Sequence, residues 1–360
     1  MRKNFQKKRL FVAKGNRRTW HQYLIWIVLA IGLFYSILFL WPVVPSASND
    51  PNSHPGSYKA KIAPQSGISA ISLQLSEQGI ASNPFILQIA ARALLVGSKL
   101  KPGTYLFPVR ASLASILHQM AKGDRVRESI SIIPGMAIWQ VRGLIDKHPA
   151  LIHQTKGLSS KELLQALNLS YPGDEGLFFP DTYTFDPDDA DIAIYRRSAQ
   201  AMQKQLSQIW EARPKDSPLK TPYELLILAS IIEKETGRAS DRMMIAAVFL
   251  NRLKLGMPLQ TDPTVIYGIG PKFDGNLRKA DLRKDSAYNT YMRKGLPPTP
   301  IAMPSKESLL AAVNPAQTDA IYFVARGDGG SHFSKTLKEH EIAVDQYQRN
   351  RKSSIQSSSK

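Results

Sequence analysis

The feature that most constrains this 360-residue chain is a run of 22 residues, from Trp20 to Trp41, that contains no charged side chain. A helix of this length reaches roughly 33 Å, which is enough to cross the hydrocarbon core of a bilayer. Trp20, Tyr23 and Trp41 stand near its ends, where amphipathic rings favour the headgroup level. The sequence therefore predicts a transmembrane helix over residues 20–41.

Basic residues precede this run and indicate its orientation. Residues 1–19 hold eight Lys and Arg and no acidic residue, which predicts a cytoplasmic basic arm. A single-pass protein of the plasma (inner) membrane would then place its bulk on the periplasmic or extracytoplasmic side. The alternative is a cleaved signal peptide, because Ser46-Ala47-Ser48 offers small residues, but the apolar run exceeds the usual length of about 7 to 15 residues.

The formal charge of +18 suggests a nucleic-acid partner until its location is considered. Eight of these charges lie in the arm, and four more lie in a Ser-rich segment, residues 349–360, that reads as a disordered basic tail. Only +6 remains on residues 42–348. The charge therefore indicates topology, and we expect no nucleic-acid partner; the plasma membrane itself is the expected partner of the arm.

The remaining sequence predicts an α+β protein with two folded parts. Residues 42–57 read as a Pro/Ser-rich linker, an extended tether. Residues 58–125 predict a small βααβ unit, which weakly resembles a LysM-like module, with a plain spacer as the alternative. Residues 126–348 predict a mixed α/β domain whose polar and aromatic loops are typical of a catalytic site.

One predicted helix, over residues 223–236, carries a candidate acid. Thr221 and Pro222 suit its start, its next residues are apolar, and it ends in Glu233-Lys234-Glu235. Desolvation and the helix dipole both raise the pKa of a carboxyl group there, as a proton donor to a glycosidic oxygen requires. The two glutamates point roughly 200° apart, and Glu235 has the more apolar setting. A solvated helix end is the alternative meaning of such a tripeptide.

Other polar residues are weaker candidates. Asp181 and Asp262 occupy turn-forming contexts, and turn chemistry is their favoured interpretation. The segment 288–291 (YNTY) combines aromatic faces with an amide, which suits a polysaccharide but is also common in cores. No nucleophile elbow, phosphate loop, dinucleotide fingerprint, zinc-protease motif or cysteine is present, and the histidines lack metal-ligand spacing, so we expect neither metal nor cofactor.

Nine segments, in order, resemble the signature segments of the endolytic murein transglycosylase family. They are EGLFFPDTY (175–183), ASIIEKET (229–236), NRL (251–253), QTDPTVIY (260–267), YNTY (288–291), GLPP (295–298), PI (300–301), NP (314–315) and YFV (322–324). The resemblance covers residues 100–347, and the family layout also includes a membrane anchor and a LysM-like unit. This chain departs from the family at Thr299 and Ser305, where glycine is frequent, and around His332, whose binding role it leaves in doubt.

The resemblance implies a lyase that cleaves the β-1,4 bond between N-acetylmuramic acid and N-acetylglucosamine within peptidoglycan strands, leaving 1,6-anhydro ends. It implies action on nascent strands as a terminator of elongation, with peptidoglycan synthases as candidate partners. Carried onto this sequence, the catalytic glutamate is Glu235, with Glu233 as the alternative. The residues expected to bind substrate are Asp181, Tyr183, Gln260, Thr261, Asp262, Thr264, Tyr267, Tyr288, Asn289 and Tyr291. A non-catalytic wall-binding or scaffold protein is the competing hypothesis.

Overall fold

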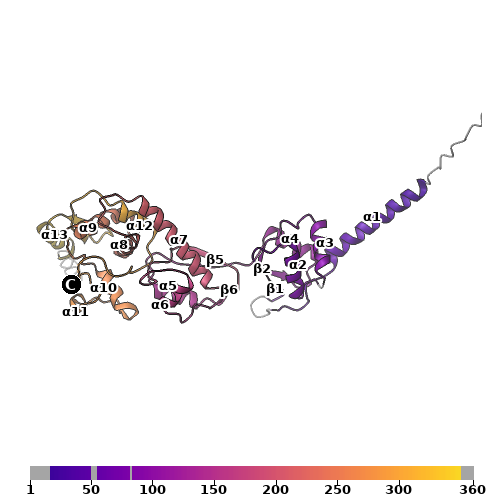
Figure 1. The fold of residues 1–360 in the computed structure, drawn as a ribbon, viewed down its shortest axis with the longest axis horizontal. Coiled ribbons are helices and arrows are strands. Elements are labelled where there is room, and N and C mark those ends of the chain that lie inside the picture. The colour runs from indigo at the N-terminus through magenta and orange to yellow at the C-terminus, as the bar shows by residue number, and fades with distance from the viewer. Residues whose placement is uncertain (1–16, 50–54, 82, 350–360) are drawn as a thin grey trace, which may run out of the picture. The chain divides into compact units, whose positions relative to one another are not determined.

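The computed structural model describes residues 17–49, 55–81 and 83–349 (Figure 1). The chain divides into two compact units, residues 1–127 and 128–360. The predicted basic arm over 1–19 and the predicted tail over 349–360 lie almost entirely outside the described residues. Both units mix helices with two-stranded sheets, so the predicted α+β class is confirmed.

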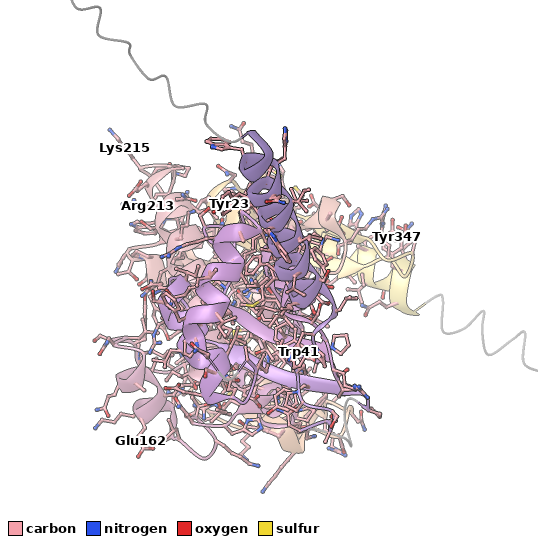
Figure 2. The ribbon with its side chains drawn as sticks, turned by 90° about the vertical axis from the view of Figure 1, so that its right-hand side faces the viewer. Tyr23, Trp41, Glu162, Arg213, Lys215 and Tyr347 are labelled. Carbon is pink, nitrogen blue, oxygen red and sulfur yellow. The ribbon has the colours of Figure 1, made fainter. Side chains whose placement is uncertain are left out.

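The first unit begins with one long apolar helix, α1 (Arg17–Leu40). Its segment Trp20–Leu40 has a mean hydropathy of 2.4 and is long and apolar enough to cross a membrane, by length and composition. Most of its large apolar side chains are exposed, and Tyr23 and Trp41 lie toward its opposite ends (Figure 2). A helix that leaves so much apolar surface uncovered needs an apolar surrounding.

The rest of the first unit confirms the predicted βααβ order. Strands β1 (Ser57–Ile62) and β2 (Gly103–Pro108) pair antiparallel, with Ala60 opposite Tyr105. Between them lie α2 (Ile68–Glu77) and α3 (Pro84–Ala93), and α4 (Leu113–Lys122) follows. We call residues 55–127 the first module. Its core is fully buried and includes Leu75, Leu87, Tyr105, Phe107, Ile116 and Leu117.

The segment predicted as a tether differs from that prediction over residues 42–49. Val44 is buried in the core of the first module, and the amides of Val43 and Val44 both donate to the Ala111 carbonyl, at 2.9 and 3.2 Å. Pro42 forms a bridge with Ser112. The Pro- and Ser-rich average composition conceals two adjacent valines that can pair and bury, so the end of α1 joins the module without slack.

The second unit starts with a small sheet and its covering helices. Strands β3 (Glu128–Ser131) and β5 (Thr182–Phe185) pair antiparallel, while β4 (Leu151–Ile152) and β6 (Asp189–Ala190) pair parallel. Helices α5 (Ile138–Asp146) and α6 (Ser160–Ala166) belong to the same part. One core holds it together and includes Ile130, Val141, Leu163, Phe178, Phe185 and Tyr195.

A helical core makes up the remainder. Helices α7 (Ile192–Glu211), α9 (Arg242–Lys254) and α12 (Lys306–Val313) all contact α8 (Pro222–Glu235) (Figure 1). The shorter elements are η1 (Ala239–Asp241), α10 (Asp262–Ile269), η2 (Gly270–Lys272), α11 (Lys279–Arg283), the antiparallel pair β7 (Tyr322–Ala325) and β8 (Ser331–Ser334), α13 (Leu337–Val344) and η3 (Asp345–Arg349).

Helix α8 is the buried centre of this core, as the sequence predicts. The Thr221 hydroxyl accepts from the Glu224 amide at 3.1 Å, and Pro222 occupies the first turn. All eight residues from Leu225 to Ile232 are buried. Even Ser230 is satisfied, because it donates to the Ile227 carbonyl and accepts from the Ile301 amide. The helix is therefore a fixed support for whatever its end presents.

One loop approaches another so closely that only glycine fits. Gly176 has a φ of +78°, and a Cβ built there would lie 2.5 Å from Cβ of Pro300. We expect Gly176→Ala to lower the free energy of unfolding by roughly 2 to 4 kcal/mol, through overpacking and a left-handed backbone. Chemical denaturation of the full chain in detergent measures this.

Gly143→Ala is the matched control for that substitution. Gly143 lies within α5 with nothing within 4 Å of an added Cβ. Alanine there should raise stability by roughly 0.5 to 1 kcal/mol, because glycine weakens a helix interior. Equal effects of the two substitutions would contradict the tight approach at Gly176.

Candidate active site

Glu235 is the last residue of α8 and stands at the centre of a polar group of side chains. The Thr261 hydroxyl donates to its Oε2 at 2.7 Å. Burial raises the pKa of the Glu235 carboxyl, and the neighbouring charge of Asp262 raises it further, while the hydrogen bond from Thr261 lowers it. Burial is the largest of these effects. The direction of this pKa shift is the one that the sequence leads us to expect at the end of a buried helix.

Threonines link the loop before α10 to the segment 288–291. The Thr261 amide donates to the Thr290 hydroxyl at 3.1 Å, and the hydroxyls of Thr264 and Thr290 are 2.8 Å apart. The Gln260 amide donates to the Thr290 carbonyl, also at 3.1 Å. Thr261, Thr264 and Thr290 are buried. The hydroxyl that contacts Glu235 is therefore held in a fixed direction.

Tyr291 and Asp262 form the exposed side of the same group. The Tyr291 hydroxyl donates to Oδ1 of Asp262 at 2.6 Å. Burial, together with this carboxylate, raises the pKa of the Tyr291 phenol, so it remains a hydrogen-bond donor at any physiological pH. Asn289 is fully buried and its amide donates to the carbonyls of Leu282 and Lys284, while its Oδ1 accepts from the Tyr291 amide. Asn289 thus positions the loop that carries Tyr291.

Aromatic rings line a cavity of about 370 Å³ beside α10. The ring of Tyr267 stacks on Trp139 with centroids 5.1 Å apart, and meets Tyr288 edge to face at 4.8 Å. Gln140, Lys234 and Phe273 also line the cavity, and Lys234 Nζ donates to the Gly135 carbonyl at 3.1 Å. Aromatic faces beside amide and ammonium donors suit a sugar carrying carbonyl or carboxylate groups.

Sequence reasoning missed Trp139, Gln140 and Phe273. Trp139 lies in α5, and an aromatic residue in an amphipathic helix is ordinarily counted as part of the apolar face. A tryptophan about one turn after a Pro-Gly pair is the sequence signal that could have identified it. Its partner Tyr267 lies 128 residues later in the chain, so no local pattern joins them.

Glu233 has quite different surroundings from Glu235. Its Oε2 accepts from the Ser305 amide at 2.9 Å, from the Ser308 hydroxyl at 2.7 Å and from the Ser305 hydroxyl. Arg242 lies 3.9 Å from the other oxygen, and the side chain is 7% exposed. Ser305 is the N-cap residue of α12 and Ser308 lies in its first turn, where the helix dipole favours a negative charge. The Glu233 carboxylate thus fixes α12 against α8.

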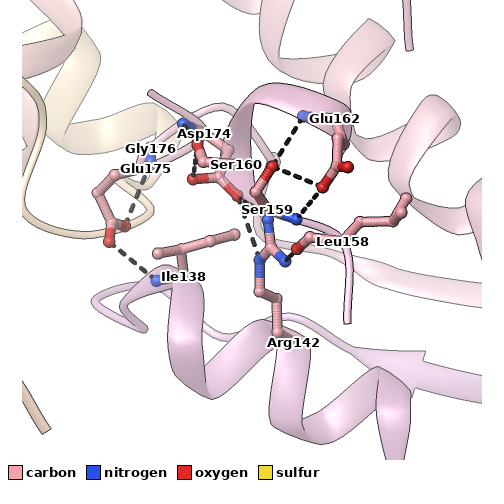
Figure 3. A network of polar contacts seen from close by, with 9 residues as sticks. All are labelled: Ile138, Arg142, Leu158, Ser159, Ser160, Glu162, Asp174, Glu175 and Gly176. Atoms are coloured by element: carbon pink, nitrogen blue, oxygen red, sulfur yellow. Dashed lines mark hydrogen bonds and ion pairs between the residues drawn. The ribbon is translucent and has the colours of Figure 1, made fainter. Parts of the chain in front are cut away.

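Glu175 is a second buried carboxyl near the cavity. It is 2% exposed and accepts from the amides of Ile138 and Gly176, at 2.9 and 3.2 Å (Figure 3). It is also hydrogen-bonded to Tyr267. Burial raises its pKa to about 7. The sequence reasoning placed Glu175 in a signature segment without a role. In the fold it joins the start of α5 to the ring of Tyr267.

The structure does not bring every expected residue to this group. Tyr183 is buried in the β3–β5 core and donates to the Phe179 carbonyl at 2.7 Å, and Asp181 accepts from the Thr182 amide in its own turn. The turn accounts for the position of Asp181, and packing in the core accounts for the position of Tyr183. The remaining residues expected to bind substrate, from Gln260 to Tyr291, gather around Glu235 and the cavity.

Thr299 and Ser305, which stand where family members frequently have glycine, both form hydrogen bonds. Thr299 and the Tyr288 hydroxyl are 2.8 Å apart, and Ser305 contacts Glu233. His332 lies on β8 with its ring 5.6 Å from that of Tyr347. Within the described ranges, no cluster of three or more His, Asp or Glu side chains is arranged to hold a metal ion.

Comparison with known proteins identifies the family. The model of the YceG-like family matches residues 60–346, so the chain belongs to this family. Over 180 residues the chain is 42% identical to a protein of Bacillus subtilis (strain 168) named endolytic murein transglycosylase. That alignment covers 50% of this chain and 49% of the relative. The chain thus matches about half the length of this curated relative.

Two further comparisons agree with this assignment. A Streptococcus pneumoniae (serotype 2, strain D39) protein of the same name is 34% identical over 179 residues, which is 48% of this chain and 32% of that protein. A crystal structure of a putative YceG-like protein from Listeria monocytogenes is 31% identical, with a TM-score of 0.52. It covers 79% of this chain and 98% of its own.

The two glutamates should differ in what they do for stability. We expect Glu233→Gln to lower the free energy of unfolding by roughly 2 to 3 kcal/mol, because donors of the α12 first turn lose a charged acceptor. Glu235→Gln should change it by less than about 1 kcal/mol, since one hydrogen bond is affected. Denaturant titration of both variants measures this, and equal losses would contradict a structural role peculiar to Glu233.

Glu175 should make the stability of the second unit depend on pH. Its pKa rises from 4.5 to about 7 on folding, so the stability present below pH 4.5 is lost as pH rises toward 7. The loss is about 3 kcal/mol at 1.36 kcal/mol per pH unit. Glu175→Gln should abolish this decline, measured by denaturant titration across pH 4.5 to 7.5.

Glu162 is the control carboxylate for that experiment. It is exposed, and hydrogen bonds from Ser159 lower its pKa, so its contribution is lost as pH falls (Figure 3). Glu162→Gln should therefore leave the decline between pH 4.5 and 7 in place. A decline that persisted unchanged in Glu175→Gln would show that another group titrates.

Proposed function

We propose that this protein is a membrane-anchored endolytic lytic transglycosylase, a lyase that cleaves the MurNAc–GlcNAc β-1,4 bond within peptidoglycan strands and leaves 1,6-anhydro-MurNAc ends. The observation that carries the proposal is the carboxyl of Glu235 at the end of a buried helix, hydrogen-bonded to Thr261 and with a pKa that burial raises. The names of the Bacillus and Streptococcus relatives support the substrate and the reaction.

Glu235 acts as the acid and then as the base. In its protonated form it donates to the glycosidic oxygen while the bond to C1 of the muramyl ring breaks. The resulting carboxylate then takes the proton of that sugar's own 6-hydroxyl, whose oxygen attacks C1 and closes the 1,6-anhydro ring. The proton balance returns Glu235 to its starting state, so no second catalytic carboxylate is needed, in contrast with ordinary glycoside hydrolysis.

The assignment to Glu235 in place of Glu233 is supported by what each carboxyl already binds. Glu233 is occupied by the serines of the α12 first turn and by Arg242. Glu235 accepts one hydrogen bond, from Thr261, which can orient the carboxyl without saturating it. A general acid must present an oxygen to its substrate, and Glu235 is the one of the pair that meets this requirement.

Substrate binding is assigned to the residues around that carboxyl. Tyr291 and Asp262, with Gln260 at the end of the loop, offer donors and acceptors for sugar hydroxyls. Tyr267 and Trp139 supply aromatic faces along the cavity, and Tyr288 supports the ring of Tyr267 from the side. Thr261, Thr264 and Asn289 act by holding the loops in place. Asp181 and Tyr183 remain expected substrate contacts only on the strength of their signature segment.

In this proposal, the first unit determines where in the cell the enzyme acts. The apolar helix α1 anchors the chain in the plasma membrane with the N-terminus cytoplasmic, and the catalytic unit lies on the extracytoplasmic side, near glycan synthesis. The βααβ order of the first module agrees with a LysM-like module, and peptidoglycan synthases are the candidate partners. An enzyme so placed would cut nascent strands and terminate their elongation.

The competing function is a wall-binding or scaffold protein that keeps the fold without the chemistry. The first module motivates it, because a small βααβ module is a common form of sugar-polymer binder. Glu235, whose pKa is raised by burial, favours the enzyme, because carboxyl groups with perturbed pKa values are typical of catalytic sites.

Glu235→Gln should abolish turnover while leaving folding and glycan binding intact, because the amide has the same shape but no proton to donate. We expect a loss of at least about a hundredfold, the usual scale of general acid catalysis. Release of fragments from uncrosslinked peptidoglycan, followed by mass spectrometry of their ends, measures both rate and product. Full activity in this variant would overturn the assignment.

The end chemistry of the product separates the remaining possibilities. Anhydro ends support the lyase reaction, whereas reducing ends would make the protein a hydrolase and would direct attention to Asp262, whose charge acts on Glu235. The absence of any fragments from the wild-type chain would favour the scaffold.

A further inference from the structure

Helix α3 of the first module is apolar on both of its faces. Its inner face, with Leu87, Ala90 and Ala91, is fully buried in the core of the module. Its outer face carries Phe85 and Ile86, which are 63% and 54% exposed. Ile89, one turn after Phe85, is 38% exposed on the same face, and Leu95 just after α3 is exposed as well. Large apolar side chains exposed along one helix face mark a surface that is covered by something.

The end of α1 lies against this same helix. The Tyr35 hydroxyl donates to the carbonyl of Ala93, the last residue of α3, at 3.4 Å. Leu38 of α1 is 3% exposed because it is buried in the core of the module. Figure 1 draws α3 and α4 at the end of α1. The chain between α1 and the module has no slack, because the Val43 amide is bonded to Ala111.

A groove connects the two apolar surfaces. It has a volume of about 370 Å³ and is lined by Phe34 and Ile37 from α1, by Trp41 just after that helix, and by Asn83, Ile86 and Leu113 from the module. The apolar surface at the end of α1 therefore meets the outer face of α3 at Ile86. Whatever solvent surrounds the last turns of α1 also reaches Ile86.

The hydrogen bond from Tyr35 shows how far along the axis of α1 the end of α3 lies. Tyr35 is five residues before the end of α1 at Leu40, which corresponds to about 8 Å along the helix axis. An amphipathic helix in a membrane interface sinks its apolar face by about 5 to 10 Å. If α1 spans the bilayer to its end, α3 lies at the depth of the headgroups and the outer acyl chains.

The charge of the module suits the same surroundings. Residues 58–127 hold nine Lys and Arg and only two acidic residues. Arg92 and Lys99 are exposed on and just after α3. Basic residues at the edge of an inserted apolar face are attracted to anionic headgroups and hold the helix in the interface.

We propose that α3 is an interfacial helix whose outer face, with Phe85, Ile86 and Ile89, inserts into the outer leaflet of an anionic membrane beside α1. This inference rests on the membrane anchoring in the proposed function. The first module is then a membrane-docking element, fixed at the bilayer surface by α1 and α3 together. The lipid bilayer is the occupant, because α1 brings it into contact with this face.

The absence of cysteine from the chain makes the test direct. Full-length single-cysteine variants are labelled with an environment-sensitive fluorophore and reconstituted in phosphatidylethanolamine–phosphatidylglycerol vesicles that contain acyl-chain spin-labelled lipid. Phe85→Cys and Leu95→Cys report on the proposed face, both at exposed positions that tolerate substitution. Val28→Cys, in the middle of α1, is the membrane control, and Lys122→Cys, at the end of α4 away from Ser112, is the water control.

We expect the labels at Phe85, Leu95 and Val28 to shift to the blue and to lose about half or more of their fluorescence to the quenching lipid, since contact with acyl chains is required. The label at Lys122 should stay unquenched. Thermal unfolding of each labelled protein confirms that the module is intact. Omission of the anionic lipid should weaken quenching at Phe85 and leave Val28 unchanged.

Each contrary outcome points to a different failure. Quenching at Val28 without quenching at Phe85 and Leu95 would overturn the inference and leave the anchoring in place. A blue shift at Phe85 without quenching by lipid would mean that a protein, either a second copy or a partner, covers the face. No quenching at Val28 would refute the membrane anchoring on which this inference rests, whereas the lyase reaction is tested separately by the end chemistry of its products.

Discussion

The second unit depends on one constraint, the burial of α8 up to its last turn. Because eight successive residues of this helix are enclosed, its end cannot move, and the two glutamates there project in fixed and different directions. One carboxylate meets the first turn of α12 and the other meets Thr261. A single helix thus provides both a structural anion and a carboxyl held close to a cavity.

The loops around this helix gain their order from buried polar residues. Asn289 satisfies backbone carbonyls of the segment before it, and Thr290 connects that segment to the loop that precedes α10. Such groups would be costly to bury if they were unpaired, so their mutual hydrogen bonds specify one arrangement of the loops. Glu175 likewise fixes the start of α5 relative to Tyr267 through hydrogen bonds. The burial of its carboxyl raises the pKa to about 7.

In the first unit, α1 packs directly on the first module, although the composition of the segment between them predicts a flexible tether. Residues 42–49 pack on the module, Leu38 enters its core, and α3 exposes apolar side chains beside the end of α1. The position of the first module relative to the end of α1 is therefore set by direct packing, and not by the length of a flexible linker.

The long apolar helix, the βααβ order, the start and end of α8 and the family of the chain could all be predicted from the sequence, because helical periodicity, capping residues and signature segments are local in the chain. The apolar residues one turn before Glu235 also favoured it as the acid. The occupation of Glu233 became visible in the fold alone, since its donors Ser305 and Ser308 lie more than 70 residues away. The core position of Tyr183, the pairing of Trp139 with Tyr267 and the burial of Val44 likewise depend on distant segments that no local pattern encodes.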